Sequence, residues 1–265
     1  MTTRSVMGIV NVTPDSFVAS ARTEDVSSAL ERGRELFAVG CHVVDVGGES
    51  TRPGATPVAL EDELSRTIDV VRNLSPWGEV SIDTRKEVVA RAAVAAGASI
   101  VNDVSGTLSE VAGDLGAGYV AMHARGTPET MQDNPRYEDV CGEVEDFLVR
   151  LAARARRAGV ERLWIDPGIG FGKTFDHNVA LLAHLDHFAD VARGLRAGLL
   201  VGTSRKRFLG ALYDPVLDVE DRREGSLASA AWAFAHGATM VRVHDALDTV
   251  RVVELIDRSV REVGS

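Results

Sequence analysis

Polar side chains able to bind a small molecule follow several short apolar segments of this sequence. Asp83, Asn102 and Asp166 each end such a segment, and their oxygens can accept hydrogen bonds from ring N–H and amino groups. A second group of residues can neutralise the oxygens of a phosphate. It contains Arg52, Arg205, Arg242 and His244. Together the two groups suit a ligand with a flat hydrogen-bonding part and an anionic part.

The lysines of the chain lie close to the same segments. Of the 29 basic residues only Lys86, Lys173 and Lys206 are lysines. Because Lys and Arg are nearly equivalent on a solvated surface, this distribution suggests local roles for an ammonium group. Lys206 stands between Arg205 and Arg207, whose charges favour its neutral form. A Schiff-base enzyme with Lys206 as nucleophile is therefore an open alternative, and the roles of Lys86 and Lys173 stay open.

Short apolar segments recur along the whole chain and predict eight strands. They alternate with Ala-, Leu- and Arg-rich segments whose apolar residues have helical spacing. The predicted strands are residues 6–10, 43–46, 80–82, 100–104, 119–122, 163–165, 199–201 and 240–243. Gly40, Gly97 and Gly237 each precede a predicted strand, where glycine can end the helix before it.

Eight strands alternating with helices predict a single (β/α)₈ TIM barrel in the α/β class. We expect one domain over residues 1–265, since no linker, low-complexity run or change of composition divides the chain. A doubly wound parallel sheet is the alternative. In a barrel the carboxyl ends of the strands carry function, so the candidate residues should meet at one face.

Charge and composition argue against some partners. The chain has 39 acidic and 29 basic residues and a net charge of −10 at pH 7, which disfavours non-specific binding of nucleic acid or of an anionic membrane. Cys41 and Cys141 form no C-x-x-C motif, so we expect free thiols in a cytoplasmic protein. Residues 168–174, GIGFGKT, look like a phosphate loop, but Pro167 stands where the first glycine of that motif belongs.

Taken in order, the segments at the predicted strand ends resemble the dihydropteroate synthase family of the folate pathway, whose members join a pterin to p-aminobenzoate. The segments are MGIVNVTPDSF, VDVGGESTRPGA, SIDTRK, IVNDVSG, MHARGTPETMQ, IDPGIGFGKT, VGTSRKRFLG and MVRVHD. The resemblance covers nearly the whole chain, residues 6–253, and it is specific because all the segments occur in the family's order.

The resemblance implies binding sites for 6-hydroxymethyl-7,8-dihydropterin pyrophosphate and for p-aminobenzoate. Pterin binding is implied for Asp83, Asn102, Met122, Asp166 and Lys206, and a catalytic role for Asp83, Asp166 and Lys206. Pyrophosphate binding is implied for Thr51, Arg52, Arg242 and His244, and Mg²⁺ binding for Asn11. Binding of p-aminobenzoate is implied for Phe17, Pro53, Phe171 and Arg207.

The resemblance also implies a mechanism and partners. In the family, pyrophosphate leaves first and the arylamine then attacks a cationic pterin methylene, which Asp83 is suited to stabilise. No covalent nucleophile is required. Sulfonamides are expected to compete with p-aminobenzoate, and the protein is expected to form a homodimer.

Two segments depart from the family pattern. Residues 18–21 read VASA where the family usually has Ser-Asp-Gly-Gly, which removes two glycines from a loop expected to close over the site. Arg207 stands where many members have Ser near the p-aminobenzoate carboxylate.

Two other functions stay open. A pterin-dependent corrinoid methyltransferase would lack the STRPG loop at residues 50–54, and a non-catalytic pterin-binding paralogue is suggested by the altered first loop.

Overall fold

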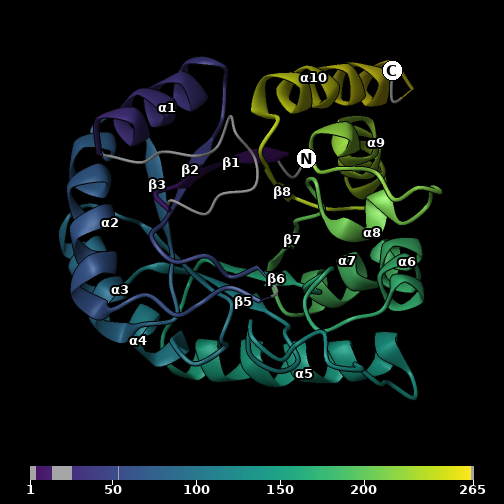
Figure 1. Ribbon diagram of the computed structural model, residues 1–265, viewed down its shortest axis with the longest axis horizontal. Helices are drawn as coiled ribbons and strands as arrows, with labels where there is room; N and C mark the ends of the chain where they lie inside the picture. Colours follow the sequence, from purple (N-terminus) through teal and green to yellow (C-terminus); the bar gives the residue numbers. More distant parts are fainter. Residues whose placement is uncertain (1–3, 14–25, 53, 264–265) are drawn as a thin grey trace.

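The computed structural model describes residues 4–13, 26–52 and 54–263, with only the backbone described for 260–263. Within these ranges eight parallel strands form a closed barrel with helices around it (Figure 1). The strands are β1 (Ser5–Asn11), β2 (Val43–Gly47), β3 (Glu79–Asp83), β4 (Ile100–Asp103), β5 (Gly118–Met122), β6 (Leu163–Asp166), β7 (Gly198–Val201) and β8 (Met240–Val243). The predicted (β/α)₈ barrel is confirmed, and the open doubly wound sheet is wrong because β8 pairs with β1.

Helices follow the strands and cover the outside of the barrel (Figure 1). They are α1 (Val26–Ala38), α2 (Leu60–Leu74), α3 (Glu87–Ala95), α4 (Ser109–Asp114), α5 (Val140–Arg157), α6 (Phe175–Ala183), α7 (Leu185–Gly194), α8 (Arg207–Gly210), the 3₁₀ helix η2 (Glu220–Arg222), α9 (Arg223–Ala235) and α10 (Ala246–Val263). The predicted glycine stops are confirmed, since Gly40, Gly97 and Gly237 follow α1, α3 and α9 with φ of 100°, 114° and 90°. In the described ranges no helix is long and apolar enough to cross a membrane.

The strands are buried on both faces, which gives the barrel two apolar layers. Met7, Val43 and Ile100 belong to a small cluster of buried side chains that also takes in β5, β7 and β8. Their neighbours Val6, Val44 and Val101 belong to the larger cluster shared with the helices. Since successive side chains of a strand point to opposite faces, the first cluster fills the barrel interior and the second seals the helices against it.

Strand register sets the predicted polar residues at a common level. Asn11 of β1 is paired with Gly47 of β2, Gly47 with Asp83 of β3, and Asp83 with Asn102 of β4. On the other side of the barrel Asp166 of β6 is paired with Met122 of β5. Because the strands are parallel, these residues all stand at the carboxyl end of the barrel, as the sequence predicts.

Candidate active site

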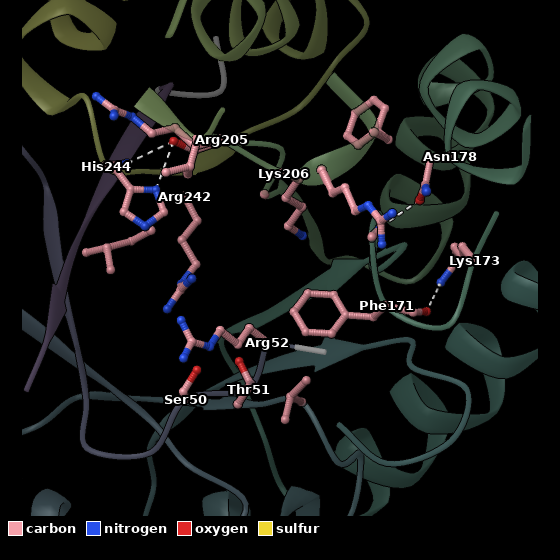
Figure 2. A pocket seen from close by; sticks show the side chains of 18 of the residues that line it. Ser50, Thr51, Arg52, Phe171, Lys173, Asn178, Arg205, Lys206, Arg242 and His244 are labelled. Carbon is pink, nitrogen blue, oxygen red and sulfur yellow. Dashed lines mark hydrogen bonds between the residues drawn. The ribbon is translucent and has the colours of Figure 1, made fainter. Parts of the chain in front are cut away.

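A cavity of about 790 Å³ lies at the carboxyl ends of the strands (Figure 2). Every predicted site residue in the described ranges lines it, namely Asn11, Thr51, Arg52, Asp83, Asn102, Met122, Asp166, Phe171, Lys206, Arg207, Arg242 and His244. Phe17, Pro53 and the altered segment 18–21 lie outside the described residues. The volume is typical of a small-molecule site.

Arg242 is held between two carboxylates beside this cavity. Its Nε donates to Asp45 Oδ2 over 2.6 Å, and its Nη2 donates to Asp83 Oδ2 over 2.7 Å. Asn102 Nδ2 donates to the same oxygen of Asp45 over 3.0 Å. The fully buried Asp45 therefore orients two site residues at once. Sequence analysis gave it no role, although a carboxylate inside the apolar strand β2 was a signal.

Burial brings the pKa values of two predicted catalytic groups close to neutral pH. Burial raises the pKa of Asp83 to about 7, with Arg242 opposing the rise and Asp45 adding to it. Burial lowers the pKa of Lys206 to about 8, against the attraction of Asp166. The pKa of Asp166 is also raised by burial, although the Lys206 charge opposes this. Groups with such shifted pKa values in a cleft are typical of active sites.

The side chains of Asp166 and Lys206 are both fixed by the loop between β6 and α6. Asp166 Oδ1 accepts a hydrogen bond from the backbone N–H of Gly168 over 2.7 Å. Lys206 Nζ donates to the carbonyl oxygen of Ile169 and lies 4.4 Å from the centroid of the Phe171 ring. The ammonium group is thus placed over an aromatic face, a favourable arrangement for a cation.

The glycine-rich run in this loop does not act as a phosphate loop. A phosphate loop points its backbone N–H groups at the anion. Here the N–H of Gly170 donates to Asn178 Oδ1 over 2.6 Å, and the N–H of Phe171 donates to the Gly168 carbonyl over 3.1 Å. These donors are used within the protein, which agrees with the mismatch at Pro167.

Lys173 binds the backbone of the loop between β6 and α6. Its buried Nζ donates to the carbonyl oxygens of Gly168 over 2.9 Å and of Phe171 over 3.1 Å, and lies 2.9 Å from His123 Nδ1. Burial lowers the pKa of His123 to about 3, so its ring is neutral and Nδ1 can accept the third hydrogen bond. Lys173 therefore positions Phe171. The sequence alone assigned no role to this lysine.

His244 contributes a neutral imidazole, not a cation. Burial and the nearby Arg242 lower the pKa of His244 to about 3. Ser204 Oγ accepts from the His244 backbone N–H over 3.1 Å and lies 3.1 Å from the ring Nδ1. The hydrogen bond between Ser204 Oγ and Nδ1 can run in either direction, depending on which ring nitrogen carries the proton. Pyrophosphate binding by His244 stays a prediction, with a neutral ring that would contribute a hydrogen bond.

The expectation that Arg205 binds phosphate is wrong, because its guanidinium group forms ion pairs within the protein. Its Nε and Nη2 donate to the two carboxylate oxygens of Asp245 over 3.0 and 2.6 Å, and its Nη1 contacts Glu220. Its backbone has the left-handed φ of 55° and its N–H donates to Ser226 Oγ over 2.8 Å. We therefore remove Arg205 from the phosphate-binding set.

Several other polar residues line the cavity without having been assigned a role from sequence, among them Gln132 and Arg222. Gln132, at the end of the segment MHARGTPETMQ, donates from Nε2 to the Gly170 carbonyl over 3.1 Å. Arg222 donates to the carbonyl oxygens of Leu217 and Arg205. Gln132 could have been found from that segment, whereas Arg222 lies in a charged stretch that gives no local signal.

The fold and the cavity define a class of protein. It is a barrel enzyme whose site, at the carboxyl ends of parallel strands, brings carboxylates and an amide together with guanidinium groups. A family model described as "Pterin binding enzyme" matches residues 7–244. The chain belongs to this pterin-binding enzyme family.

Relatives of known name agree with this assignment. The dihydropteroate synthase of Escherichia coli (strain K12) is 41% identical over 261 residues, covering 95% of this chain and 90% of the relative. A structure of Yersinia pestis dihydropteroate synthase with a sulfonamide drug complex superimposes with a TM-score of 0.90, at 36% identity over 97% of this chain and 94% of that one. The structure of Burkholderia cenocepacia dihydropteroate synthase complexed with 7,8-dihydropteroate superimposes with a TM-score of 0.84. It is 41% identical, covering 98% of this chain and 92% of that one.

The close packing of the β6–α6 loop predicts that Gly168 cannot be replaced. Its φ is 64°, and an added Cβ would lie 1.7 Å from the carbonyl oxygen of His123. We expect Gly168→Ala to lower the stability by about 2 kcal/mol or more, and the Tm by about 5 °C, because it forces a left-handed alanine and a backbone clash. Thermal unfolding followed by circular dichroism measures this. Gly194→Ala, with nothing within 4 Å of the added Cβ, is the control; equal Tm values for the two variants would contradict the prediction.

Proposed function

We propose that this chain condenses 6-hydroxymethyl-7,8-dihydropterin pyrophosphate with p-aminobenzoate, giving 7,8-dihydropteroate and pyrophosphate in folate biosynthesis. The observation that carries the proposal is the cavity in which Asp83 and Asp166 stand beside Arg52 and Arg242. Carboxylates suit the N–H and amino edge of a pterin, and guanidinium groups suit a pyrophosphate. A relative solved with 7,8-dihydropteroate supports it.

The pterin ring is bound by the group at the ends of β3 to β7. Asp166 accepts hydrogen bonds from the N–H and amino edge of the pyrimidine, Asn102 binds a second edge, and Lys206 donates to the carbonyl. Met122, level with Asp166, supplies an apolar contact to the ring. The fixed rotamers of Asp166 and Asn102 support this assignment, because each is already hydrogen-bonded within the protein.

The pyrophosphate is bound by Thr51, Arg52, Arg242 and His244. In Figure 2 the guanidinium groups of Arg52 and Arg242 point toward one another, with Thr51 beside Arg52 and His244 beside Arg242, which supports binding of one anion by these residues. Arg242 stays oriented by Asp45 and Asp83 while it does so. The neutral ring of His244 adds a hydrogen-bonding group that carries no charge.

Mg²⁺ fits this site through Asn11. The ion prefers oxygen ligands and commonly binds through one or two protein groups together with substrate phosphates and water. Gly47, the β2 partner of Asn11, adds no side chain beside the amide, since a Cβ there would lie 3.6 Å from Asn11 Oδ1. Among the described residues no group of three His, Cys, Asp or Glu could hold a metal, which favours a phosphate-bound ion. When bound, Mg²⁺ would neutralise charge on the leaving group.

Asp83 stabilises the positive charge that develops on the pterin. The C–O bond to pyrophosphate breaks, and its electron pair leaves with the pyrophosphate. The arylamine nitrogen then forms the new C–N bond and loses a proton. A carboxylate already in place beside the developing cation lowers the barrier without forming a bond. Lys206 Nζ already donates a hydrogen bond to the Ile169 carbonyl, which supports its role as a hydrogen-bond donor.

The aromatic acid lies against Phe171, and Arg207 binds its carboxylate. Both residues line the cavity. Phe17 and Pro53 complete this site in the proposal, although they lie outside the described residues. Sulfonamides compete for the same place, a proposal that the sulfonamide complex of the Yersinia pestis relative supports.

The two alternative functions are less well supported. A corrinoid methyltransferase has no use for a pyrophosphate site, yet Thr51, Arg52 and Arg242 all line the cavity. A non-catalytic paralogue has no need of a carboxylate and an ammonium with near-neutral pKa values.

We also propose a cytoplasmic homodimer. Cys41 and Cys141 are free thiols, which suits a reducing compartment.

Turnover of the purified protein tests the proposed function. With the pterin pyrophosphate, p-aminobenzoate and Mg²⁺, we expect 7,8-dihydropteroate and pyrophosphate in equal amounts, measured by mass spectrometry and a phosphate assay. A sulfonamide should raise the apparent KM for p-aminobenzoate. Tight pterin binding with no pyrophosphate released under any condition would refute the enzyme and leave the non-catalytic paralogue.

Asp166→Asn is expected to weaken pterin binding by about 100-fold. One oxygen stays with the Gly168 N–H, so the new amide must point a donor at the donors of the pterin, and each mismatched group costs about 1–3 kcal/mol. Calorimetry with 6-hydroxymethylpterin measures the Kd. Asp176→Asn, an exposed carboxylate in α6, is the control. A Kd in Asp166→Asn within twofold of the control would remove Asp166 from the site.

The pH profile of kcat/KM should be bell-shaped. Asp83 must be a carboxylate, so activity falls as pH drops through about 7, and Lys206 must be an ammonium, so activity falls as pH rises through about 8. Steady-state rates across this range measure both limbs. In Lys206→Arg the alkaline limb should disappear while the acid limb stays. A flat profile for the unmodified enzyme, or an unchanged alkaline limb in the variant, would contradict the assignment.

A further inference from the structure

A cluster of charged residues lies beneath the loop between β2 and α2. We call Glu49, Glu63, Arg85 and Lys86 the Lys86 cluster. Lys86 Nζ donates to both Glu49 and Glu63, and Arg85 Nε lies 2.6 Å from Glu49 Oε1. The side chain of Glu63 is fully buried and that of Glu49 is 4% exposed. The residues come from three places in the sequence, so the cluster joins the loop to α2 and to the start of α3.

Glu49 closes the loop that carries Thr51 and Arg52. Its Oε2 accepts from the backbone N–H of Val58 over 3.0 Å, so one carboxylate ties together the two ends of this loop. Arg66 Nη1 of α2 donates to the Gly48 carbonyl over 3.0 Å and holds the start of the same loop. The placement of Thr51 and Arg52 therefore depends on where Glu49 is held.

The other end of the Lys86 cluster belongs to the segment that carries Asp83. Thr84 directly follows Asp83, and its Oγ1 donates to Glu63 Oε1 over 2.6 Å. The backbone N–H of Lys86 in turn donates to Thr84 Oγ1 over 3.1 Å. One short segment after β3 thus places Asp83 in the cavity and Lys86 under the neighbouring loop.

The charges of the cluster depend on one another. Burial by itself would raise the pKa of Glu49, but hydrogen bonds from Lys86 and Val58 and the nearby cations lower it overall. The pKa of Lys86 is raised by Glu49 and Glu63 in spite of its burial. Removing one partner of a buried ion pair leaves an uncompensated charge, which is strongly unfavourable. The ion pairs of the cluster therefore stabilise one another in this arrangement.

We propose that Lys86 is a positioning residue for pyrophosphate binding, because it bridges Glu49 and Glu63 and so sets Thr51 and Arg52 relative to Asp83. This inference rests on the function proposed above for the loop. Lys86 does not line the cavity, whereas Glu49 does. Of the residues proposed to bind the pterin ring, only Asp83 shares the segment of Lys86, and its side chain is held separately by Arg242. Loss of Lys86 should therefore affect the anion much more than the ring.

Two ligands that separate the anion from the ring test this proposal. For Lys86→Met we expect the Kd of inorganic pyrophosphate with Mg²⁺, and the KM for the pterin pyrophosphate, to rise about tenfold. The Kd of 6-hydroxymethylpterin should change less than twofold. Arg91→Met is the matched control, since it removes a cation of α3 whose partners Glu87 and Asp114 are exposed. It should leave all three constants unchanged.

The conservative variant separates positioning from stability. Lys86→Arg keeps the charge and should restore most of the pyrophosphate affinity, and it is the variant to measure if Lys86→Met does not fold. Equal changes in the pyrophosphate and pterin constants, or no change in either, would overturn the inference. If the unmodified protein binds pyrophosphate but makes no 7,8-dihydropteroate, the proposed function fails, while the pyrophosphate Kd values of the variants still decide the role of Lys86.

Discussion

The site depends on one cation shared by two buried carboxylates. Arg242 of the last strand reaches Asp45 of the second and Asp83 of the third, and Asp45 also orients Asn102 of the fourth. The buried carboxylates and the partly buried guanidinium are tolerated here because each has an opposite charge or a hydrogen bond. The arrangement depends on the closed barrel, since pairing between β8 and β1 brings Arg242 close to the strands that carry Asp45 and Asp83. The pairing that closes the barrel therefore also assembles the site.

Burial has opposite consequences for acids and bases within this one cavity. It raises the pKa of Asp83 and lowers that of Lys206, so the two approach each other near neutral pH. The same effect keeps His244 and His123 uncharged. The positive charge of the cavity is thus carried by guanidinium groups, whose charge survives burial, together with Lys206. The acidic total of the chain describes the surface and not this site.

Much of the fold and the membership of the site could be predicted from the sequence. Eight apolar segments with glycine-terminated helices specify the barrel, and parallel strands bring all their carboxyl ends together. Individual partners could not be predicted. Arg205 and Arg242 look alike at two strand ends, but Asp245 holds one and Asp45 and Asp83 share the other. Which carboxylate lies nearest is a property of the folded chain.

The lysine content of the chain has a chemical consequence. Lys173 directs its amine at acceptors in different directions, which a planar guanidinium cannot copy. Lys86 bridges two carboxylates next to the loop that carries Thr51 and Arg52. Lys206 belongs to the cavity itself. With no other lysine in the sequence, every side-chain amine of the folded protein lies in or beneath the binding site. A reagent selective for side-chain amines therefore distinguishes this site from the remaining side chains of the molecule.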